Sequence, residues 1–426
     1  MRFRAGRRTR GAPLAVVLAL CAVVTGCTAQ PSTPKPSATA ASTTAVDPAV
    51  RESPVVARAR LASDEYDYDR ALALLQPLES PAALRLAAEV REAKRTARAW
   101  PHDSAVSHLF FHSLIVDPAR AFDGDADAAG YDDYMVTLAE FQKVLRSLYA
   151  RGFVLVSPHD LASLDGAHRM RYRPIVLPRG RTPIVLSQDD VDYYRYEQGD
   201  GLASDLTLRG GRVVSTYRDR SGATRFGAYD VATVVDAFVQ QHPDFSYRGH
   251  KGVLALTGYE GVLGYRTSAI RDARNPHLAA DRAQAKRVAD ALKQEGWEFA
   301  SHSWGHIDDT TASVGWLQRD SARWNAEVRP ITGPTDLYVY PFGADISGVA
   351  PYSGAKYAVL ERYGFHSFFG IDGSQPSWQQ LRGSSLRQAR IDIDGIRLRG
   401  GASGRETVLR RFFDPRAVLD PARPRR

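Results

Sequence analysis

Three short polar clusters in this sequence could form one reactive site, because each follows an apolar, strand-like run. They are QDD at 188–190 after TPIVLS, HSWGH at 302–306 after GWEFAS, and PFG at 341–343 after DLYVY. If these runs are parallel strands of a barrel, their carboxyl ends meet at one rim. Two imidazoles and a carboxylate at that rim match a metal site with three protein ligands and one position open for water. Each cluster alone also fits an ordinary turn, but their shared placement favours a site.

The elements around these clusters follow a regular order. From about residue 105 onward, short apolar runs such as FVLVS and GVLALTG alternate with longer amphipathic stretches such as AADRAQAKRVADALKQEG. This alternation predicts a parallel α/β fold, as a closed barrel or an open sheet, over 105–410. Residues 193–228 interrupt it and are rich in glycine, which predicts an inserted β-rich flap with a hairpin turn at Gly210-Gly211. Since loops at the catalytic rim vary function, we expect this flap to shape substrate choice.

The N-terminus has the features of an export signal. A basic stretch, MRFRAGRRTRG, precedes the apolar APLAVVLALCAVV and then VTGC, which predicts a lipoprotein signal peptide over 1–26 with a lipid on Cys27. An ordinary signal peptide with an incidental cysteine is the alternative. Cys21 and Cys27 are the only cysteines, so the mature protein is expected to contain no internal disulfide, although it works outside the cytoplasm.

Two segments separate this signal from the α/β region. Residues 27–49 are almost entirely Ala, Ser, Thr and Pro, a composition that predicts a disordered tether. Residues 50–100 carry apolar side chains at helical spacing, interrupted at Pro77 and Pro81. We interpret this segment as a small helical hairpin in front of the main domain.

Composition limits the classes of partner. The chain has 426 residues, 44% of them hydrophobic, which is enough for a large core. Its formal charge of +8 falls to about +3 without the five arginines of residues 1–26. No basic block interleaved with aromatic residues is present, so a nucleic-acid partner is not expected. A monomer is expected.

Taken in order, the motifs resemble those of the polysaccharide deacetylases, metal-dependent carbohydrate esterases with a distorted (β/α) barrel. SQDD at 187–190 is similar to the family's TFDD motif, HSWGH at 302–306 matches its H-[ST]-x-x-H motif, and PFG at 341–343 matches the end of its third motif. FFHSL at 110–114 resembles the Tyr-His element of the family's first strand. The resemblance covers roughly residues 105–400.

This resemblance implies a division of roles. Asp190, His302 and His306 would hold a divalent metal, with zinc as the expected ion, and Asp189 would be the general base that activates water. A backbone N–H near Tyr340 would stabilise the oxyanion. The segment that would bind substrate or the oxyanion comprises Tyr340, Pro341, Phe342 and Gly343.

The sequence also departs from the family's pattern. Gln188 stands in place of an aromatic residue, and the third-motif arginine that helps orient the base is missing from the stretch before Pro341. Arg390, in RQARIDID, is a candidate to replace that cation. The late Leu-x-His motif that supplies the general acid has no match, so His112 and His366 are the candidate substitutes, although either could equally be a structural histidine.

The resemblance therefore implies an N-deacetylase of a cell-envelope or extracellular polysaccharide, anchored to the bacterial cell membrane through lipid on Cys27. The missing arginine and histidine leave a second hypothesis open, a catalytically weak carbohydrate-binding lipoprotein that keeps the barrel. Hydrolysis of an ester or of another amide at the same metal centre is a third.

Overall fold

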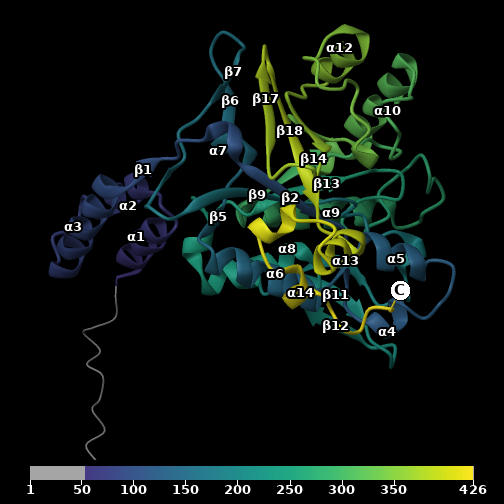
Figure 1. Cartoon of the computed structure of the whole chain (residues 1–426), viewed down its shortest axis with the longest axis horizontal. Coiled ribbons are helices and arrows are strands. Elements are labelled where there is room, and N and C mark those ends of the chain that lie inside the picture. The colour runs from purple at the N-terminus through teal and green to yellow at the C-terminus, as the bar shows by residue number, and fades with distance from the viewer. Residues whose placement is uncertain (1–52, 426) are drawn as a thin grey trace, which may run out of the picture. The chain divides into compact units, whose positions relative to one another are not determined.

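Seven parallel strands form a closed barrel in the computed structural model, which describes residues 53–425 (Figure 1). The strands pair in chain order and the last pairs with the first, which closes the sheet. They are β2 (Ser107–Phe111), β9 (Thr182–Gln188), β13 (Gly252–Leu256), β14 (Trp297–Ser301), β15 (Leu337–Val339), β16 (Ser367–Ile371) and β18 (Ser385–Asp392). The predicted α/β barrel is confirmed, and the barrel is closed rather than open.

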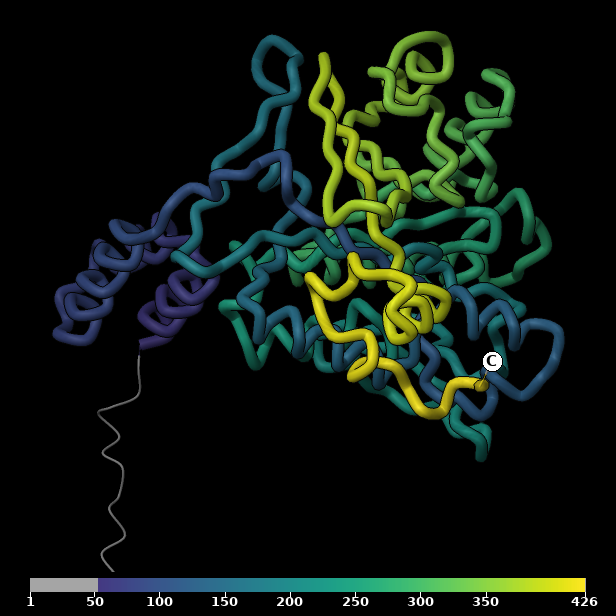
Figure 2. The backbone as a smooth tube through the Cα atoms, in the orientation of Figure 1, coloured from purple at the N-terminus to yellow at the C-terminus, as the bar shows by residue number. Residues whose placement is uncertain are grey.

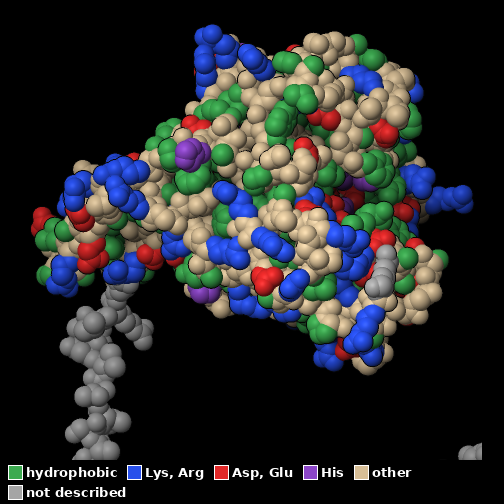
Figure 3. Space-filling view, viewed as in Figure 1, with side chains coloured by type: hydrophobic (Ala, Val, Ile, Leu, Met, Phe, Trp, Pro, Cys, Tyr) green, Lys and Arg blue, Asp and Glu red, His purple; other side chains and the backbone are tan. Residues whose placement is uncertain are grey.

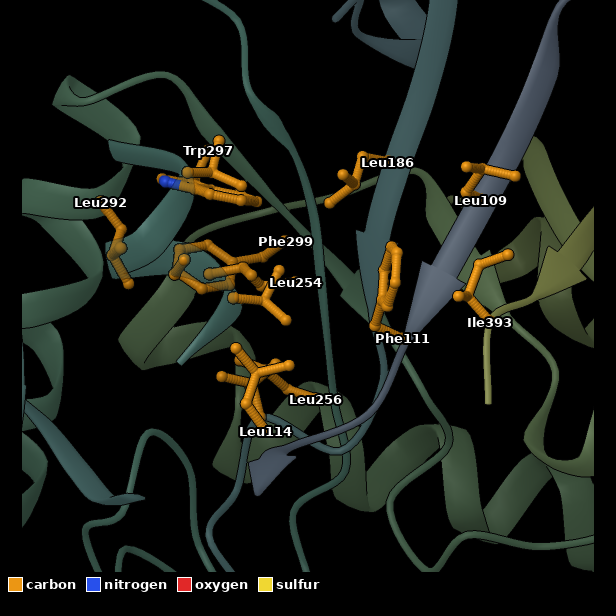
Figure 4. Packing of buried hydrophobic residues seen from close by; sticks show 14 of the residues in the cluster. Leu109, Phe111, Leu114, Leu186, Leu254, Leu256, Leu292, Trp297, Phe299 and Ile393 are labelled. Atoms are coloured by element: carbon orange, nitrogen blue, oxygen red, sulfur yellow. The ribbon is translucent and has the colours of Figure 1, made fainter. Parts of the chain in front are cut away.

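Helices cover the outside of this barrel, which is why most of its strands are rich in apolar residues on both faces. All five residues of β13 are buried. The longer covering helices are α6 (Leu138–Ala150), α8 (Val231–Gln241), α9 (Leu278–Gln294), α10 (Val314–Glu327), α12 (Gly354–Arg362) and α13 (Gly395–Ser403). In Figure 4, Leu254, Phe299 and Trp297 lie side by side in the resulting core.

Local signals in the sequence start these helices and turn the chain between them. Thr137 and Glu140 form a reciprocal cap at the start of α6, with hydrogen bonds of 3.1 and 2.8 Å between each side chain and the other's backbone N–H. Gly296, with φ +97°, turns the chain from α9 into β14. A Cβ at this position would lie 1.9 Å from the carbonyl oxygen of Gly249, so only glycine fits.

Shorter elements extend this framework. β5 (Phe153–Leu155) pairs in parallel with the first residues of β9, and β17 (Trp378–Arg382) forms an antiparallel hairpin with β18. The short helices are α4 (Pro118–Ala121), α5 (Ala128–Tyr134), α7 (Pro158–Leu161), α11 (Arg329–Thr332) and α14 (Pro415–Val418). The 3-10 helices are η2 (Asp103–Ala105), η3 (Arg195–Glu197), η4 (Pro243–Phe245), η5 (Pro341–Gly343) and η6 (Val408–Arg411). The small paired strands are β1 (Arg98–Ala99), β3 (Leu114–Ile115), β4 (Val136–Thr137), β6 (Ala162–Leu164), β7 (Met170–Tyr172) and β8 (Val176–Leu177).

Three helices precede the barrel, where the sequence predicted two. They are α1 (Pro54–Asp64), α2 (Tyr68–Leu75) and α3 (Pro81–Thr96), in the purple and blue part of Figure 2. Pro81 does not interrupt a helix, because it occupies the first turn of α3, where its missing N–H costs nothing. The helices share a hydrophobic cluster with Val154, Val185 and Tyr247, so they pack on the flank of the barrel.

The insertion at 193–228 divides into two parts. Its first residues form η3, which reaches the carboxyl rim of the barrel. The rest forms a three-stranded antiparallel sheet of β10 (Ala203–Arg209), β11 (Arg212–Arg218) and β12 (Thr224–Gly227), with Gly210 and Gly211 in the first turn. Leu206 and Val213 anchor this sheet in the main core, where it contacts α8 and α9.

The end of the chain packs more extensively than expected. Beyond the predicted domain end at 410, the buried Arg423 donates to the Glu140 carboxylate and to the backbone carbonyl of Asp132. Among residues 53–425, no helix is both long enough and apolar enough to span a bilayer. The predicted signal at 1–26, the lipid-bearing Cys27 and the tether at 27–49 lie outside the described residues.

Candidate metal centre

The carboxyl rim of the barrel brings the predicted ligands together. Asp189 and Asp190 directly follow β9, and His302 and His306 follow β14, two strands further round the ring. All four residues line one cavity of about 660 Å³. In Figure 3 a hollow right of centre contains acidic and histidine side chains, coloured red and purple.

The donor atoms are close enough to share one ion. The Nε2 atoms of His302 and His306 lie 4.0 and 3.8 Å from Oδ1 of Asp190, and the three donors lie within 4.8 Å of one another. Two metal–ligand bonds of about 2.1 Å would span these gaps, and the set of two imidazoles and one carboxylate suits zinc. The residues present therefore fit a divalent metal.

The backbone at these ligands is held in an uncommon conformation. Asp190, Ser303 and His306 have positive φ angles of 57°, 52° and 51°. Such angles in non-glycine residues are disfavoured, and they cluster at functional sites where surrounding contacts hold them. The Asp320 carboxylate supplies part of that support, since it accepts the backbone N–H groups of Trp304 and Gly305 at 2.7 and 2.8 Å.

Hydrogen bonds also orient the ligands' side chains. Nδ1 of the buried His302 donates to the backbone carbonyl of Val339 at 2.9 Å, which leaves Nε2 facing the cavity. Burial lowers the pKa of His302, which favours the neutral imidazole that metals bind. The Tyr194 hydroxyl donates to Oδ1 of Asp190 at 2.6 Å. This contact was not predicted from the sequence.

Arg390 contacts the predicted base. Its Nη1 and Nη2 donate to Oδ1 and Oδ2 of Asp189 at 2.6 and 2.9 Å, a paired geometry that only a guanidinium provides. Both side chains are buried, and the guanidinium carbon lies 4.0 Å from the centre of the Phe110 ring. Burial alone would raise the pKa of Asp189, but the charge of Arg390 holds it well below its usual range. Asp189 is therefore an ionised carboxylate beside the three donors.

The third cluster offers one free backbone donor. The N–H of Tyr340 donates to the carbonyl of Phe369 at 3.0 Å, Pro341 has no N–H, and the N–H of Gly343 donates to the carbonyl of Tyr340. Within the described residues, the Phe342 N–H makes no hydrogen bond. Of the four residues predicted here, Phe342 is thus the one whose backbone can bind an oxyanion.

The two candidate histidines lie at opposite ends of the barrel. His112 follows β2 and lines the cavity, and its buried Nδ1 has no hydrogen-bond partner among residues 53–425. His366 precedes β16, so it lies at the amino-terminal rim, where its backbone N–H binds the carbonyl of Asp336. The suggestion that His366 could serve the site is wrong, because a residue before a parallel strand cannot reach the rim where the strands end.

The cavity also contains acidic residues that the sequence analysis did not single out, Asp127, Glu197 and Asp392. Asp392 lines the cavity, and its buried Oδ1 has no partner in the described part of the chain. Burial, together with the nearby Asp394 and Asp189 carboxylates, raises the pKa of Asp392 well above its usual range. Side chains two apart on a strand share a face, so the alternation in RQARIDID could have placed Asp392 beside Arg390.

Exposed aromatic rings surround the cavity mouth. Tyr134, Tyr196 and Phe342 are 57%, 52% and 68% exposed, and all three line the cavity. Large exposed rings of this kind offer flat apolar faces for a ring-shaped ligand. The neighbouring Tyr193 is instead buried and donates to Asp230. Gln188 also points to Asp230, at 2.9 Å, and so away from the cavity.

Comparison with known proteins gives one match. No protein-family model matches the sequence, and no curated protein sequence does either. A solved structure, Streptococcus pyogenes deacetylase PplD in complex with acetate, aligns with 69% of this chain and 96% of its own, at 13% identity and a TM-score of 0.35. At this TM-score the match adds nothing to the fold that the strand pairings establish.

A buried carboxyl group next to the metal-binding loop predicts a pH effect on stability. Burial raises the pKa of Asp309 to about 8, and the Tyr338 hydroxyl donates to its carboxylate at 2.7 Å. Because the folded-state pKa lies above the unfolded one, this group lowers the free energy of unfolding progressively as the pH rises from about 4 to about 8.

Asp309→Asn should remove this loss, since the amide stays neutral and its oxygen can still accept from Tyr338. Relative to the wild type, the variant should gain several kcal/mol between about pH 5 and about pH 9, at about 1.4 kcal/mol per pKa unit. Urea unfolding at both pH values measures the change. Parallel pH profiles for the two proteins would contradict the raised pKa.

Proposed function

We propose that this protein is a metal-dependent hydrolase that removes N-acetyl groups from a cell-envelope or extracellular polysaccharide. One observation carries the proposal: the donors of Asp190, His302 and His306 share a cavity with an ionised, arginine-bound Asp189. A ligand triad beside a separate carboxylate base is the arrangement that metal-assisted amide hydrolysis needs.

A divalent metal held by Asp190, His302 and His306 would supply Lewis acidity for the acetyl carbonyl and for water. Asp189 would accept the proton of the attacking water, because Arg390 keeps its carboxylate ionised. The N–H of Phe342 would donate to the oxyanion.

The remaining step is protonation of the departing amine. His112 lines the same cavity, and its position after β2 places it across the ring from the two histidine ligands after β14. Histidine is the side chain that most often transfers protons in enzymes, so His112 is the side chain we assign as general acid.

The exposed rings support a carbohydrate as the ligand. Aromatic faces at a cavity mouth suit the apolar faces of sugar rings, and Tyr134, Tyr196 and Phe342 border the opening. The binding-only hypothesis depended on a missing cation and a missing histidine. Arg390 contacts Asp189 and His112 lines the cavity, so a cation and a histidine are available for these roles, which supports the hydrolase over the binding-only hypothesis.

Metal removal tests this function directly. We expect the purified mature protein to release acetate from an N-acetylated oligosaccharide, to lose this activity after dialysis against a chelator, and to regain it with zinc. Free acetate and the new amino groups are measured together. An O-acetylated sugar in parallel separates amide from ester hydrolysis. Absence of acetate release from every N-acetylated glycan by the zinc-loaded protein would leave the binding-only hypothesis.

The proposed location is the outer side of the cell membrane, with a lipid on Cys27. Cys27→Ser should move the protein from the membrane fraction to the soluble one. Mass spectrometry of the wild-type N-terminal peptide checks for the lipid. An unmodified Cys27, with the variant still in the membrane fraction, would refute the anchor.

A further inference from the structure

A second, arginine-rich cavity adjoins the catalytic one. It has a volume of about 800 Å³ and is lined by Arg195, Arg266, Arg271 and Arg274, together with His277. The 3-10 helix η3 separates the two cavities. Its first residue, Arg195, lines the arginine cavity, whereas the next two residues, Tyr196 and Glu197, line the catalytic cavity.

The arginine cavity has more positive than negative charge. Four arginines face two aspartates, Asp272 and Asp281. Asp272 is bound to Arg195 at 2.7 Å, and Asp281 accepts from the side-chain amide of Asn275 at 2.8 Å. Both carboxylates therefore already have partners.

Two of the guanidinium groups are free. Within residues 53–425, the side chains of Arg271 and Arg274 form no hydrogen bond, ion pair or ring contact. A third, Arg266, is only partly exposed, and it donates to the backbone carbonyls of Glu260 and Tyr193 at 2.9 and 2.7 Å. Burial and the charge of Arg195 lower the pKa of Arg266. Arg195 and Arg266 thus have carboxylate partners, Asp272 at 2.7 Å and Glu260 at 3.7 Å, whereas Arg271 and Arg274 have none among residues 53–425.

Several contacts hold η3 and the residue before it in place between the two cavities. The backbone N–H of Arg195 donates to the Glu260 carboxylate at 2.9 Å. The ring of Tyr194 stacks between Tyr196 and Tyr259, with ring centres 5.6 and 5.4 Å apart, and its hydroxyl binds Asp190. A long ligand that extends from the metal ligands across the exposed ring of Tyr196 would therefore reach the arginines.

We propose that the arginine cavity binds a phosphate or carboxylate group on the same glycan chain whose acetamido sugar occupies the catalytic cavity. The preferred substrate would then be an acidic N-acetylated polysaccharide. This inference rests on the proposed deacetylase function. Guanidinium groups suit it because their planar donors match both oxyanions.

Charge removal at the two free arginines tests the inference. The double variant Arg271→Gln/Arg274→Gln keeps the fold intact, since neither side chain holds another group. The matched control is Arg85→Gln/Arg91→Gln, which removes the same charge from exposed positions on α3. The substrates are a neutral N-acetylglucosamine oligomer and oligomers of equal length carrying one phosphate or one carboxylate.

We expect the wild type to show a higher kcat/KM for the acidic oligomers, and the Arg271/Arg274 variant to lose about three- to ten-fold on them alone, the range for two partly exposed ion pairs. Salt should reduce the wild-type preference. The two acidic oligomers distinguish phosphate from carboxylate. The neutral oligomer and the α3 variant should behave as the wild type does.

Two outcomes would distinguish failure of the arginine subsite from failure of the proposed deacetylase function. Equal kcat/KM on neutral and acidic oligomers in all three proteins would refute the arginine cavity as a subsite while leaving the deacetylase standing. If no oligomer yields acetate, the proposed function fails, and calorimetric binding of the acidic oligomers to wild type and variant decides the inference: unchanged affinity would overturn it.

Discussion

The double variant His302→Ala/His306→Ala is expected to contain no stoichiometric metal and to release acetate only at the background rate. These residues supply two of the three donors, and their Nε2 atoms lie 4.0 and 3.8 Å from the third, Oδ1 of Asp190. Loss of a ligand's outer partner alone typically lowers metal affinity about 10- to 100-fold, so loss of two ligands should abolish binding. Metal content by elemental analysis and acetate release are measured on the same preparation.

The matched control is His168→Ala/His366→Ala. It makes the same chemical change at two histidines whose rings lie 6.3 Å apart and which are absent from the catalytic cavity. This variant should keep its metal and its activity. A full equivalent of metal in the His302/His306 variant would exclude the proposed centre, and equal metal loss in both variants would point to general unfolding instead.

The sequence predicts those parts of the site in which an apolar, strand-like run is followed closely by residues that can bind a metal. TPIVLS and WEFAS are mainly apolar runs, and carboxylates or imidazoles follow them closely. Topology alone therefore brings Asp190, His302 and His306 to one rim. The position of a residue before or after its strand also distinguishes the two histidines proposed as general acids. His112 comes after its strand and reaches the cavity, whereas His366 comes before its strand and does not.

The strand β18 shows why other parts could not be predicted. Its buried residues include Arg387, Gln388 and Arg390, so it lacks the apolar run that identifies a barrel strand. Gln388 and Arg390 bind side chains far away in the sequence, His108 and Asp189. Pairings between residues about 200 or more positions apart leave no local pattern in a single sequence.

Backbone details of the site could not be predicted from the sequence either. The free N–H of Phe342 depends on the paths that the neighbouring amides take, and the positive φ of Asp190 depends on the loop's tertiary contacts. The glycines of the insertion made it recognisable, but its division into η3 and a three-stranded sheet could not be predicted. Only Tyr196 and Glu197 of residues 193–228 line the catalytic cavity, while β10 and β11 pack on the helices, β10 on α9 and β11 on α8 and α9. Its influence on substrate choice stays a prediction, now centred on η3.

Asp189→Asn separates the base from the ligands. The variant should keep its metal, because Asp190, His302 and His306 are unchanged, while acetate release falls about 10²- to 10⁴-fold, the usual cost of losing a general base. The change also leaves the buried Arg390 facing a neutral amide. Because breaking a buried ion pair costs about 3–5 kcal/mol when one partner is removed, we expect a lower Tm, with the amide oxygen as a remaining acceptor.

Activity must therefore be measured well below the Tm of the variant, with metal content determined on the same sample. Asp309→Asn is the control, since it makes the same substitution at a buried carboxyl group outside the cavity and should retain activity. Turnover like that of the wild type in Asp189→Asn would assign the base to another group, for which Asp392, another acidic residue of the cavity, is a candidate. Loss of metal would instead mean that Asp189, not Asp190, is the ligand, and Arg390 would then support a metal-binding carboxylate rather than a base.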